Sequence, residues 1–182
     1  MSKTYLIDTS VIIDNPFMNL AKLSQNNTNT LIITETVLSE LDKHKTSLRT
    51  DVKLSARIFF RAMKNSKFKK TKKVKAQNKD NVYKLKLKFE DQQDTPINLI
   101  VIVRNKYKPE TLQEESKNDA KIREIAESYK ATCITNDISF QAIAMSMGLK
   151  VESLHWNTIK DPEKLSFFQE YTIFEEEKDS FI

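Results

Sequence analysis

Residues 3–10 read Lys-Thr-Tyr-Leu-Ile-Asp-Thr-Ser, a short apolar run that ends in a carboxylate, and this stretch decides the fold. Its apolar residues predict a buried strand that ends at Asp8. Residues 131–137, Ala-Thr-Cys-Ile-Thr-Asn-Asp, repeat the pattern and put Asp137 directly after another strand. In α/β proteins the carboxyl ends of parallel strands open into one crevice. We therefore expect Asp8 and Asp137 to lie at the same edge of a sheet.

The rest of the chain alternates between strand and helix patterns. Further strands are expected at residues 31–33, 97–103 and 149–154, and helices at 11–23 (interrupted near Pro16), 36–45 and 51–64. One more helix is expected to start at Ser116 and another to run from Asn136 to Met147, each capped by its first residue. This alternation predicts an α/β domain.

Charge is unevenly distributed along the 182 residues, whose net charge is +5. Eleven lysines lie between Lys64 and Lys88. Residues 170–182 hold five acids and one lysine and so carry −4, which leaves +9 on the remainder. A basic surface of this kind indicates an anionic partner such as nucleic acid. The acidic tail is expected either to compete for that surface or only to aid solubility.

Residue usage excludes several kinds of site. Gly148 is the only glycine, so neither a P-loop nor a dinucleotide-binding motif can be present. Two histidines and one cysteine are too few for a zinc site, and no G-x-S-x-G motif occurs. The lone Cys133 indicates a reducing compartment. Because no signal-peptide core or membrane-length apolar run is present, we expect a cytoplasmic protein without a membrane partner.

Basic side chains gather in two adjoining segments. Helix 51–64 carries an expected apolar face of Leu54, Ile58, Ala62 and Met63 beside a basic stripe. Residues 66–80 lack apolar periodicity and are expected to form a loop, and residues 82–103 a β-hairpin with lysines on one face. A solvated helix face and a protected edge strand are the plain alternatives. The predicted nucleic-acid-binding residues are Arg49, Lys53, Arg57, Arg61, Lys69, Lys70, Lys72, Lys73 and Lys75.

Two further acids are expected at the crevice, Glu40 and Asp119. Carboxylates gathered there repel one another unless a cation neutralises them, and Mg²⁺ or Mn²⁺ suits an all-oxygen site. Asp119, taken alone, is equally explained as an acid favoured by the start of its helix. Glu35 and Asp42 are near competitors for the role of Glu40. The set predicts metal-assisted chemistry on phosphate.

Four short motifs carry a family resemblance. They are Leu-Ile-Asp-Thr-Ser at residues 6–10, Val-Leu-Ser-Glu-Leu-Asp at 37–42, Asn-Asp-Ala-Lys-Ile at 118–122 and Ile-Thr-Asn-Asp-Ile at 134–138. In this order and at these spacings they resemble the four acidic motifs of PIN-domain ribonucleases, and most closely the PIN domain that precedes the PhoH-type ATPase in many bacterial proteins. That group shares a basic helix after the second motif and a hairpin before the third. These 182 residues contain no ATPase motif and the hairpin is lysine-rich, so coupling to ATP hydrolysis is not carried over.

The resemblance implies a three-layer α/β/α fold with a central parallel sheet and a lysine-rich β-hairpin insertion. It implies a PIN-like domain over residues 1–156, the insertion at about 65–104, and an acidic-aromatic tail at 157–182. It also implies Mg²⁺- or Mn²⁺-dependent endonucleolytic cleavage of single-stranded RNA that leaves 5′-phosphate and 3′-hydroxyl ends. By position in the motifs, the metal-binding and catalytic acids are Asp8, Glu40, Asp119 and Asp137, and the supporting hydroxyls are Thr9, Ser10 and Thr135.

Two other functions remain open at this point. A non-catalytic nucleic-acid-binding module would keep the fold and the basic surface without turnover. A PIN-like structure-specific nuclease would act on single-stranded or flap DNA. Intact acids at all four motif positions favour an enzyme. Homodimer formation is compatible with the sequence, which identifies neither the natural RNA nor any inhibitor protein.

Overall fold

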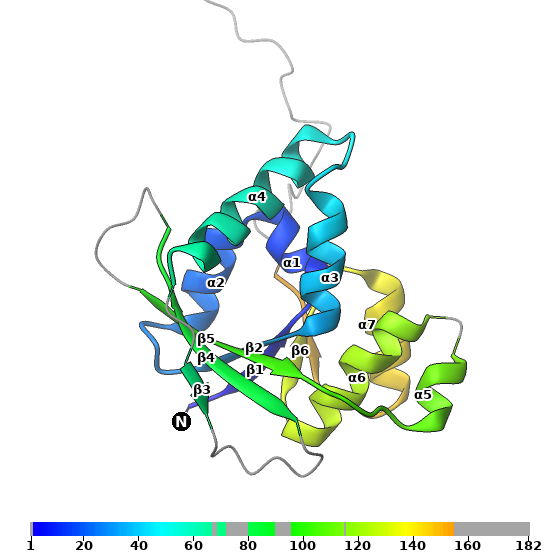
Figure 1. Ribbon diagram of the computed structural model, residues 1–182. Coiled ribbons are helices and arrows are strands. Elements are labelled where there is room, and N and C mark those ends of the chain that lie inside the picture. The colour runs from blue at the N-terminus through cyan, green and yellow to red at the C-terminus, as the bar shows by residue number, and fades with distance from the viewer. Residues whose placement is uncertain (1, 67–68, 72–79, 90–95, 115, 155–182) are drawn as a thin grey trace, which may run out of the picture.

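The computed structural model describes residues 2–66, 69–71, 80–89, 96–114 and 116–154. The predicted outer domain boundaries at residues 1 and 156 and the predicted tail at 157–182 lie outside the described residues. The described strands form a seven-stranded sheet in the order β3-β4-β5-β2-β1-β6-β7 (Figure 1). Five neighbouring strands run parallel to one another. They are β5 (Ile97–Val103), β2 (Thr30–Thr34), β1 (Thr4–Ile7), β6 (Thr132–Ile134) and β7 (Val151–Glu152).

Helices cover both faces of this sheet, which confirms the predicted three-layer fold. The first layer contains α1 (Thr9–Asp14), α2 (Pro16–Ser24), α3 (Glu35–His44) and α4 (Thr50–Lys64). The second contains α5 (Pro109–Gln113), α6 (Lys117–Tyr129) and α7 (Ile138–Ser146). The chain moves from β1 toward β5 and then crosses to β6 on the other side of β1. Right-handed crossovers in these two directions put their helices on opposite faces (Figure 1).

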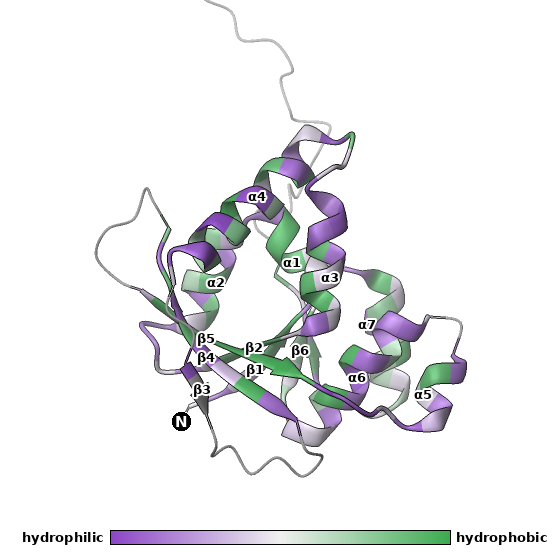
Figure 2. Cartoon of the chain, in the orientation of Figure 1, coloured by the Kyte–Doolittle hydropathy of each residue, from purple (hydrophilic) through white to green (hydrophobic). Residues whose placement is uncertain are grey.

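The core lies between the central strands and the two helical layers. Leu6, Ile33 and Ile102 are fully buried, as are Phe59 of α4 and Phe140 of α7. Figure 2 shows the apolar residues on the strands and α1, with hydrophilic residues on the outer sides of α3 and α4. The strands β1, β2 and β6 are almost entirely buried because both of their faces are covered.

The predicted hairpin is present and extends the parallel sheet. The strand β4 (Asn81–Leu87) pairs antiparallel with β5 in the register Lys84↔Ile100. Because β5 also pairs in parallel with β2, the second hairpin strand belongs to the main sheet. The short strand β3 (Lys69–Thr71) pairs with β4, where the sequence predicts only a loop. Strand prediction depends on alternating apolar residues, and the lysine-rich strand β3 lacks this pattern.

Three local expectations require correction. Leu54 of α4 is 57% exposed, and the buried stripe is Val52, Ala56, Phe59 and Met63, which recur at helical spacing. Ser116 precedes α6 as expected but makes no side-chain cap hydrogen bond. The helix α7 is capped by Asp137 and not by Asn136, whose Oδ1 accepts from the backbone N–H of Leu154.

None of the helices in the described part of the chain is both long and apolar enough to cross a membrane.

Candidate active site

The carboxylate of Asp8 lies at the carboxyl end of the central strand β1, where it caps α1. Its Oδ2 accepts from Ser10 Oγ at 2.6 Å, Thr135 Oγ1 at 2.8 Å and the Ser10 backbone N–H at 3.3 Å. None of the hydrogen bonds within the described residues uses its Oδ1. Asp8 is 7% exposed. One oxygen is therefore fixed by the protein while the other is left for a ligand.

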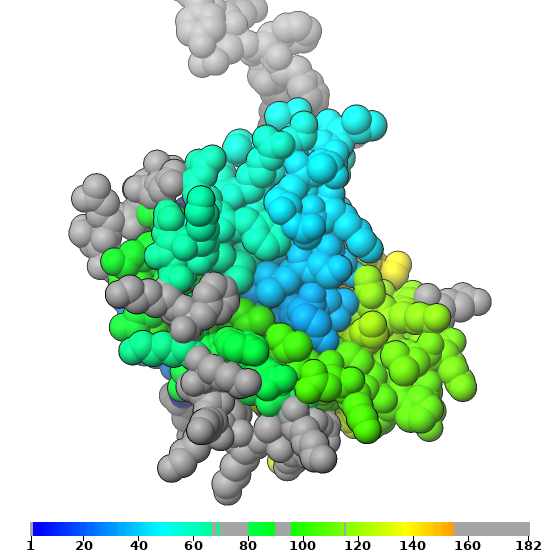
Figure 3. Space-filling view, in the orientation of Figure 1, coloured from blue at the N-terminus to red at the C-terminus, as the bar shows by residue number. Residues whose placement is uncertain are grey.

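Glu40 is brought to this edge from α3. Its Oε2 accepts from Thr9 Oγ1 at 2.5 Å, and its Oε1 accepts from Asn118 Nδ2 at 2.7 Å. These bonds join α3 to the start of α1 and the start of α6. In the space-filling view the surface of α3 lies between those of α4 and α6 (Figure 3). The two helical layers therefore meet at the carboxyl edge of the sheet.

Asp119 is half-buried in the first turn of α6 and is coupled to all three other acids. Burial raises the pKa of its carboxyl, and the negative charges of Asp8, Glu40 and Asp137 raise it further. The positive charge of Arg123 opposes this shift in the pKa. Neighbouring charges shift a pKa only when they lie close to the titrating group. Asp119 therefore lies within electrostatic range of the other three acids.

Asp137 is exposed at the start of α7, after β6. Its Oδ1 accepts from the backbone N–H groups of Ser139 at 2.8 Å and Phe140 at 3.1 Å. Its own N–H donates to Thr135 Oγ1 at 3.1 Å, so Thr135 links Asp137 to Asp8. The strands β1 and β6 are neighbours on either side of the point where strand order reverses. Ligands of open α/β sheets bind at this point.

The donor set of this crevice fits a hard divalent cation. All of its side chains offer oxygen ligands, which Mg²⁺ and Mn²⁺ prefer, and the carboxylates around Asp119 raise its pKa where a cation would lower it. Within the described ranges, no three His, Cys, Asp or Glu side chains stand close enough to hold one ion together. Both oxygens of Glu40 are hydrogen-bonded. The side chains of the acids would therefore have to adopt other rotamers to bind one ion together.

The two competitors of Glu40 have other partners. Asp42 forms an ion pair with Lys45 on the surface of α3. Glu35 accepts from the hydroxyl of Tyr107 and from the backbone N–H of Arg104. Neither contacts Thr9 or Asn118. The geometry therefore favours Glu40 as the acid that α3 contributes.

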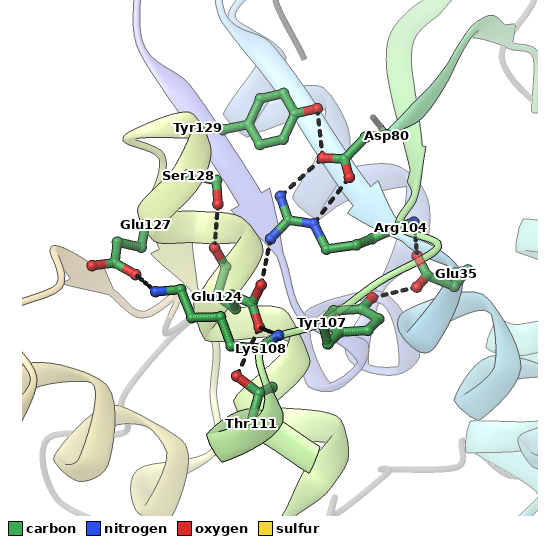
Figure 4. Close-up of polar contacts among 10 residues, drawn as sticks. All are labelled: Glu35, Asp80, Arg104, Tyr107, Lys108, Thr111, Glu124, Glu127, Ser128 and Tyr129. Carbon is green, nitrogen blue, oxygen red and sulfur yellow. Dashed lines mark hydrogen bonds and ion pairs between the residues drawn. The ribbon is translucent and has the colours of Figure 1, made fainter. Parts of the chain in front are cut away.

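A buried ion network lies beside the crevice, at the carboxyl end of β5 (Figure 4). The guanidinium of Arg104 donates to both oxygens of Asp80, at 2.9 and 3.0 Å, and to Glu124 at 3.0 Å. Glu124 also accepts from Thr111 Oγ1 at 2.7 Å. The side chains of Arg104, Asp80 and Glu124 are almost fully buried. The network fixes α5 and α6 against the end of β5.

The sequence does not predict the roles of two polar residues near the acids. For Asn118, the only indication in the sequence is its position directly before Asp119. Arg123 follows Asp119 by one helical turn and is 2% exposed. It donates through Nη2 to Glu114 and lies 5.9 Å from the ring centre of Phe140. Its Nε and Nη1 have no hydrogen-bond partner among the described residues.

The predicted basic residues fall on one helix and one short strand. Arg57 and Arg61 are exposed on α4, which packs against α1 and α3, and Lys53 is half-exposed there. Arg49 pairs with the exposed Asp51 at 2.6 Å. Lys69 is exposed on β3. The side chain of Lys70 lies outside what the structure describes, as do residues Lys72, Lys73 and Lys75.

The fold and the site together define a class of protein. It is a doubly wound α/β protein with an acidic crevice at the point between β1 and β6 where the strand order reverses. The chain belongs to the PIN domain family, because the family model for the PIN domain matches residues 5–155. Members of this family are in general metal-dependent nucleases.

Solved structures were compared as well. A domain of a functionally unknown protein from Methanocaldococcus jannaschii DSM 2661 is 18% identical, with a TM-score of 0.52, over 93% of this chain and 100% of that chain. VapBC2 from Rickettsia felis, bound to a DNA fragment from its promoter, is 19% identical, with a TM-score of 0.43, over 82% of this chain and 98% of that chain. The first likeness supports the fold alone. The search of curated proteins found no match.

Proposed function

We propose that this protein is a metal-dependent endoribonuclease that cleaves single-stranded RNA. The observation that carries the proposal is the set of hydrogen bonds at the carboxyl edge of the parallel strands, where Thr135 bonds both Asp8 and Asp137, and Asn118, next to Asp119, bonds Glu40. In a PIN domain, four such acids would hold one or two Mg²⁺ or Mn²⁺ ions. When bound, such an ion supplies activation of water and offsets charge on a phosphodiester under attack.

The chain's own residues have separate roles in this proposal. Asp8, Glu40, Asp119 and Asp137 bind the cation. Ser10 and Thr135 hold the Asp8 carboxylate, and Thr9 holds that of Glu40. These hydroxyls keep the acids in place despite their mutual repulsion.

The finer placement within the family is also a proposal. A basic helix, α4, follows the second acidic motif, and the β4–β5 hairpin precedes the third. Both features support kinship with the PIN domains that precede PhoH-type ATPases.

The buried thiol of Cys133, whose pKa is raised by burial to about 12, is unreactive and is compatible with a cytoplasmic location.

The proposal is tested by incubating the purified protein with labelled single-stranded RNA, duplex RNA and flap DNA in Mn²⁺, Mg²⁺ or EDTA. Cleavage of single-stranded RNA in Mn²⁺ or Mg²⁺ but not in EDTA is expected. Cleavage of flap DNA alone would instead identify a structure-specific DNA nuclease. Binding without cleavage of any substrate would identify a non-catalytic module.

Glu40→Gln is expected to lower the rate of RNA cleavage by about 100-fold, which corresponds to about 2.7 kcal/mol in the barrier. Gln keeps the oxygen that accepts from Thr9 or Asn118 but loses the charge that binds a cation. The measurement is kcat/KM in Mn²⁺. Asp42→Asn on the same helix is the matched control and should retain full activity. The reverse ranking of the two variants would move the site to the outer face of α3.

Neutralising Lys53, Arg57 and Arg61 together to Gln should weaken RNA binding without regard to sequence. We propose that these residues bind phosphates, as do the predicted lysines of residues 69–75. Each phosphate that the variant no longer binds should flatten the slope of log affinity against log salt by roughly 0.7, so the slope should change by about 2. Fluorescence anisotropy in EDTA measures this. A slope equal to that of the wild type would show that the basic face of α4 is only solvated.

A further inference from the structure

A groove of about 620 Å³ lies on the hairpin side of the sheet. It is lined by β4, by the starts of β5 and β2, by the turn before β2, by Lys69 of β3, and by Asn65 and Ser66 directly after α4. The helices α6 and α7 pack on β6 and β7, whereas β3 and β4 lie at the opposite edge of the sheet (Figure 1). On this part of the sheet, one face carries none of the described helices.

The groove is strongly basic. Lys84, Lys86 and Lys88 occupy alternate positions along and just after β4, so they point to one face, and all three are exposed. Lys69 of β3 stands directly opposite Lys84. Like charges in such a cross-strand pair repel and destabilise the sheet. None of the four lysines has an ion pair within the described residues, and the described lining contains no carboxylate.

Edge protection accounts for only part of this arrangement. The strand β3 is the outermost described strand and pairs with β4 only at residues 82–84, so Lys86 lies beside a stretch of the β4 edge that pairs with no described strand, whereas Lys84 lies where β4 is paired on both sides. Protection of an edge also does not require cations to face one another across a strand pair. A ligand that carries several negative charges would relieve the repulsion between Lys69 and Lys84.

The groove is distinct from the acidic crevice. Asn98 and Thr30, which line it, stand near the amino ends of β5 and β2, whereas the acids gather at the carboxyl ends of the parallel strands. A strand of seven residues such as β5 spans roughly 20 Å. A molecule that occupies both places must therefore be a polymer.

We propose that this groove is a second RNA-binding surface, which holds the phosphate backbone of a single strand at a distance from the acids. Alternate lysines on a strand lie roughly 7 Å apart, a spacing comparable to that of successive phosphates in an extended single strand. The side-chain amides of Asn65 and Asn98 add hydrogen-bonding capacity, whereas that of Asn27 already bonds the backbone of Pro96 and Asn98. No aromatic side chain is among the described lining residues, so binding should depend on phosphates and little on bases. The choice of RNA as occupant rests on the proposed function.

The test uses the full chain with Lys84→Gln, Lys86→Gln and Lys88→Gln combined. Binding to 20-nucleotide U-rich and mixed-sequence RNA is measured in EDTA over a range of salt. We expect affinity at low salt to fall by about 10- to 100-fold for both RNAs, and the salt slope to flatten by about 2.

A matched variant, with Lys22, Lys130 and Lys150 changed to Gln, removes the same net charge elsewhere and should lose much less RNA affinity. Because the lysines are exposed and Lys84→Gln removes the repulsion from Lys69, the melting temperature should equal or exceed that of the wild type. In Mn²⁺ the groove variant should show a raised KM and an unchanged kcat.

Unchanged affinity and slope, or an equal loss in the matched variant, would overturn the proposal. So would binding of a synthetic peptide of residues 165–182 to the wild type but not to the groove variant while RNA affinity stays constant, since the groove would then hold the acidic tail. Because binding is measured in EDTA, the result does not depend on cleavage. Absence of cleavage by the wild type would contradict the proposed function and leave the groove result standing.

Discussion

Asp8→Asn is expected to abolish RNA cleavage, by at least about 1000-fold or about 4 kcal/mol in the barrier, and to leave the protein folded. The three hydrogen bonds to Asp8 all reach Oδ2, and the amide oxygen of Asn can accept each of them. Asn is also as good a helix cap as Asp. The variant therefore loses mainly the charge that a cation requires. Removal of one of four repelling carboxylates should leave the metal-free melting temperature equal or raised.

The measurements are single-turnover cleavage in Mn²⁺, RNA binding in EDTA and thermal melting without metal. Asp14→Asn, at the exposed end of the same helix, is the control and should behave as the wild type. RNA binding by Asp8→Asn in EDTA should also persist, because the basic surfaces are intact. Full activity of Asp8→Asn in Mn²⁺ would remove Asp8 from the proposed site.

Arg104→Met should be the most destabilising substitution among those considered. The guanidinium is fully buried between Asp80 and Glu124, and its removal leaves two buried carboxylates without their cation. Breaking a buried pair in this way costs about 3–5 kcal/mol. For a domain of this size the melting temperature should fall by roughly 10 °C or more. Thermal melting followed by circular dichroism measures the change.

Two further variants isolate the cause. Arg49→Met breaks an exposed ion pair with Asp51 and should leave the melting temperature unchanged. Adding Asp80→Asn and Glu124→Gln to Arg104→Met should restore part of the stability, because the uncompensated charges are then absent. A triple variant no more stable than Arg104→Met would show that poorer packing, and not buried charge, is responsible.

Local sequence patterns were sufficient for the fold and for the location of Asp8 and Asp137. Asp8 and Asp137 each follow a short apolar strand, and parallel strands of an α/β fold end at one edge. The cap of α7 was assigned one residue too early because Asn136 and Asp137 are both good caps. Only the structure shows that Asn136 instead binds the backbone of Leu154.

Contacts between residues far apart in the chain could not be predicted in this way. The choice among Glu35, Glu40 and Asp42 depends on Thr9 and Asn118, which are distant from α3 in sequence. The network of Arg104 with Asp80 and Glu124 likewise joins three separate segments. The pairing of Lys69 with Lys84 runs against cross-strand charge preference, so no propensity rule anticipates it.

The most direct test of the central claim is anomalous diffraction from a crystal of the full chain soaked in Mn²⁺. The claim is that Asp8, Glu40, Asp119 and Asp137 hold a divalent cation in one crevice. The expected result is an anomalous peak bounded by the Asp8 carboxylate and at least one of the other three acids, and loss of that peak in Asp8→Asn. Absence of any peak at Asp8, with Mn²⁺ found only at surface acids such as Asp42 or Glu127, would contradict it.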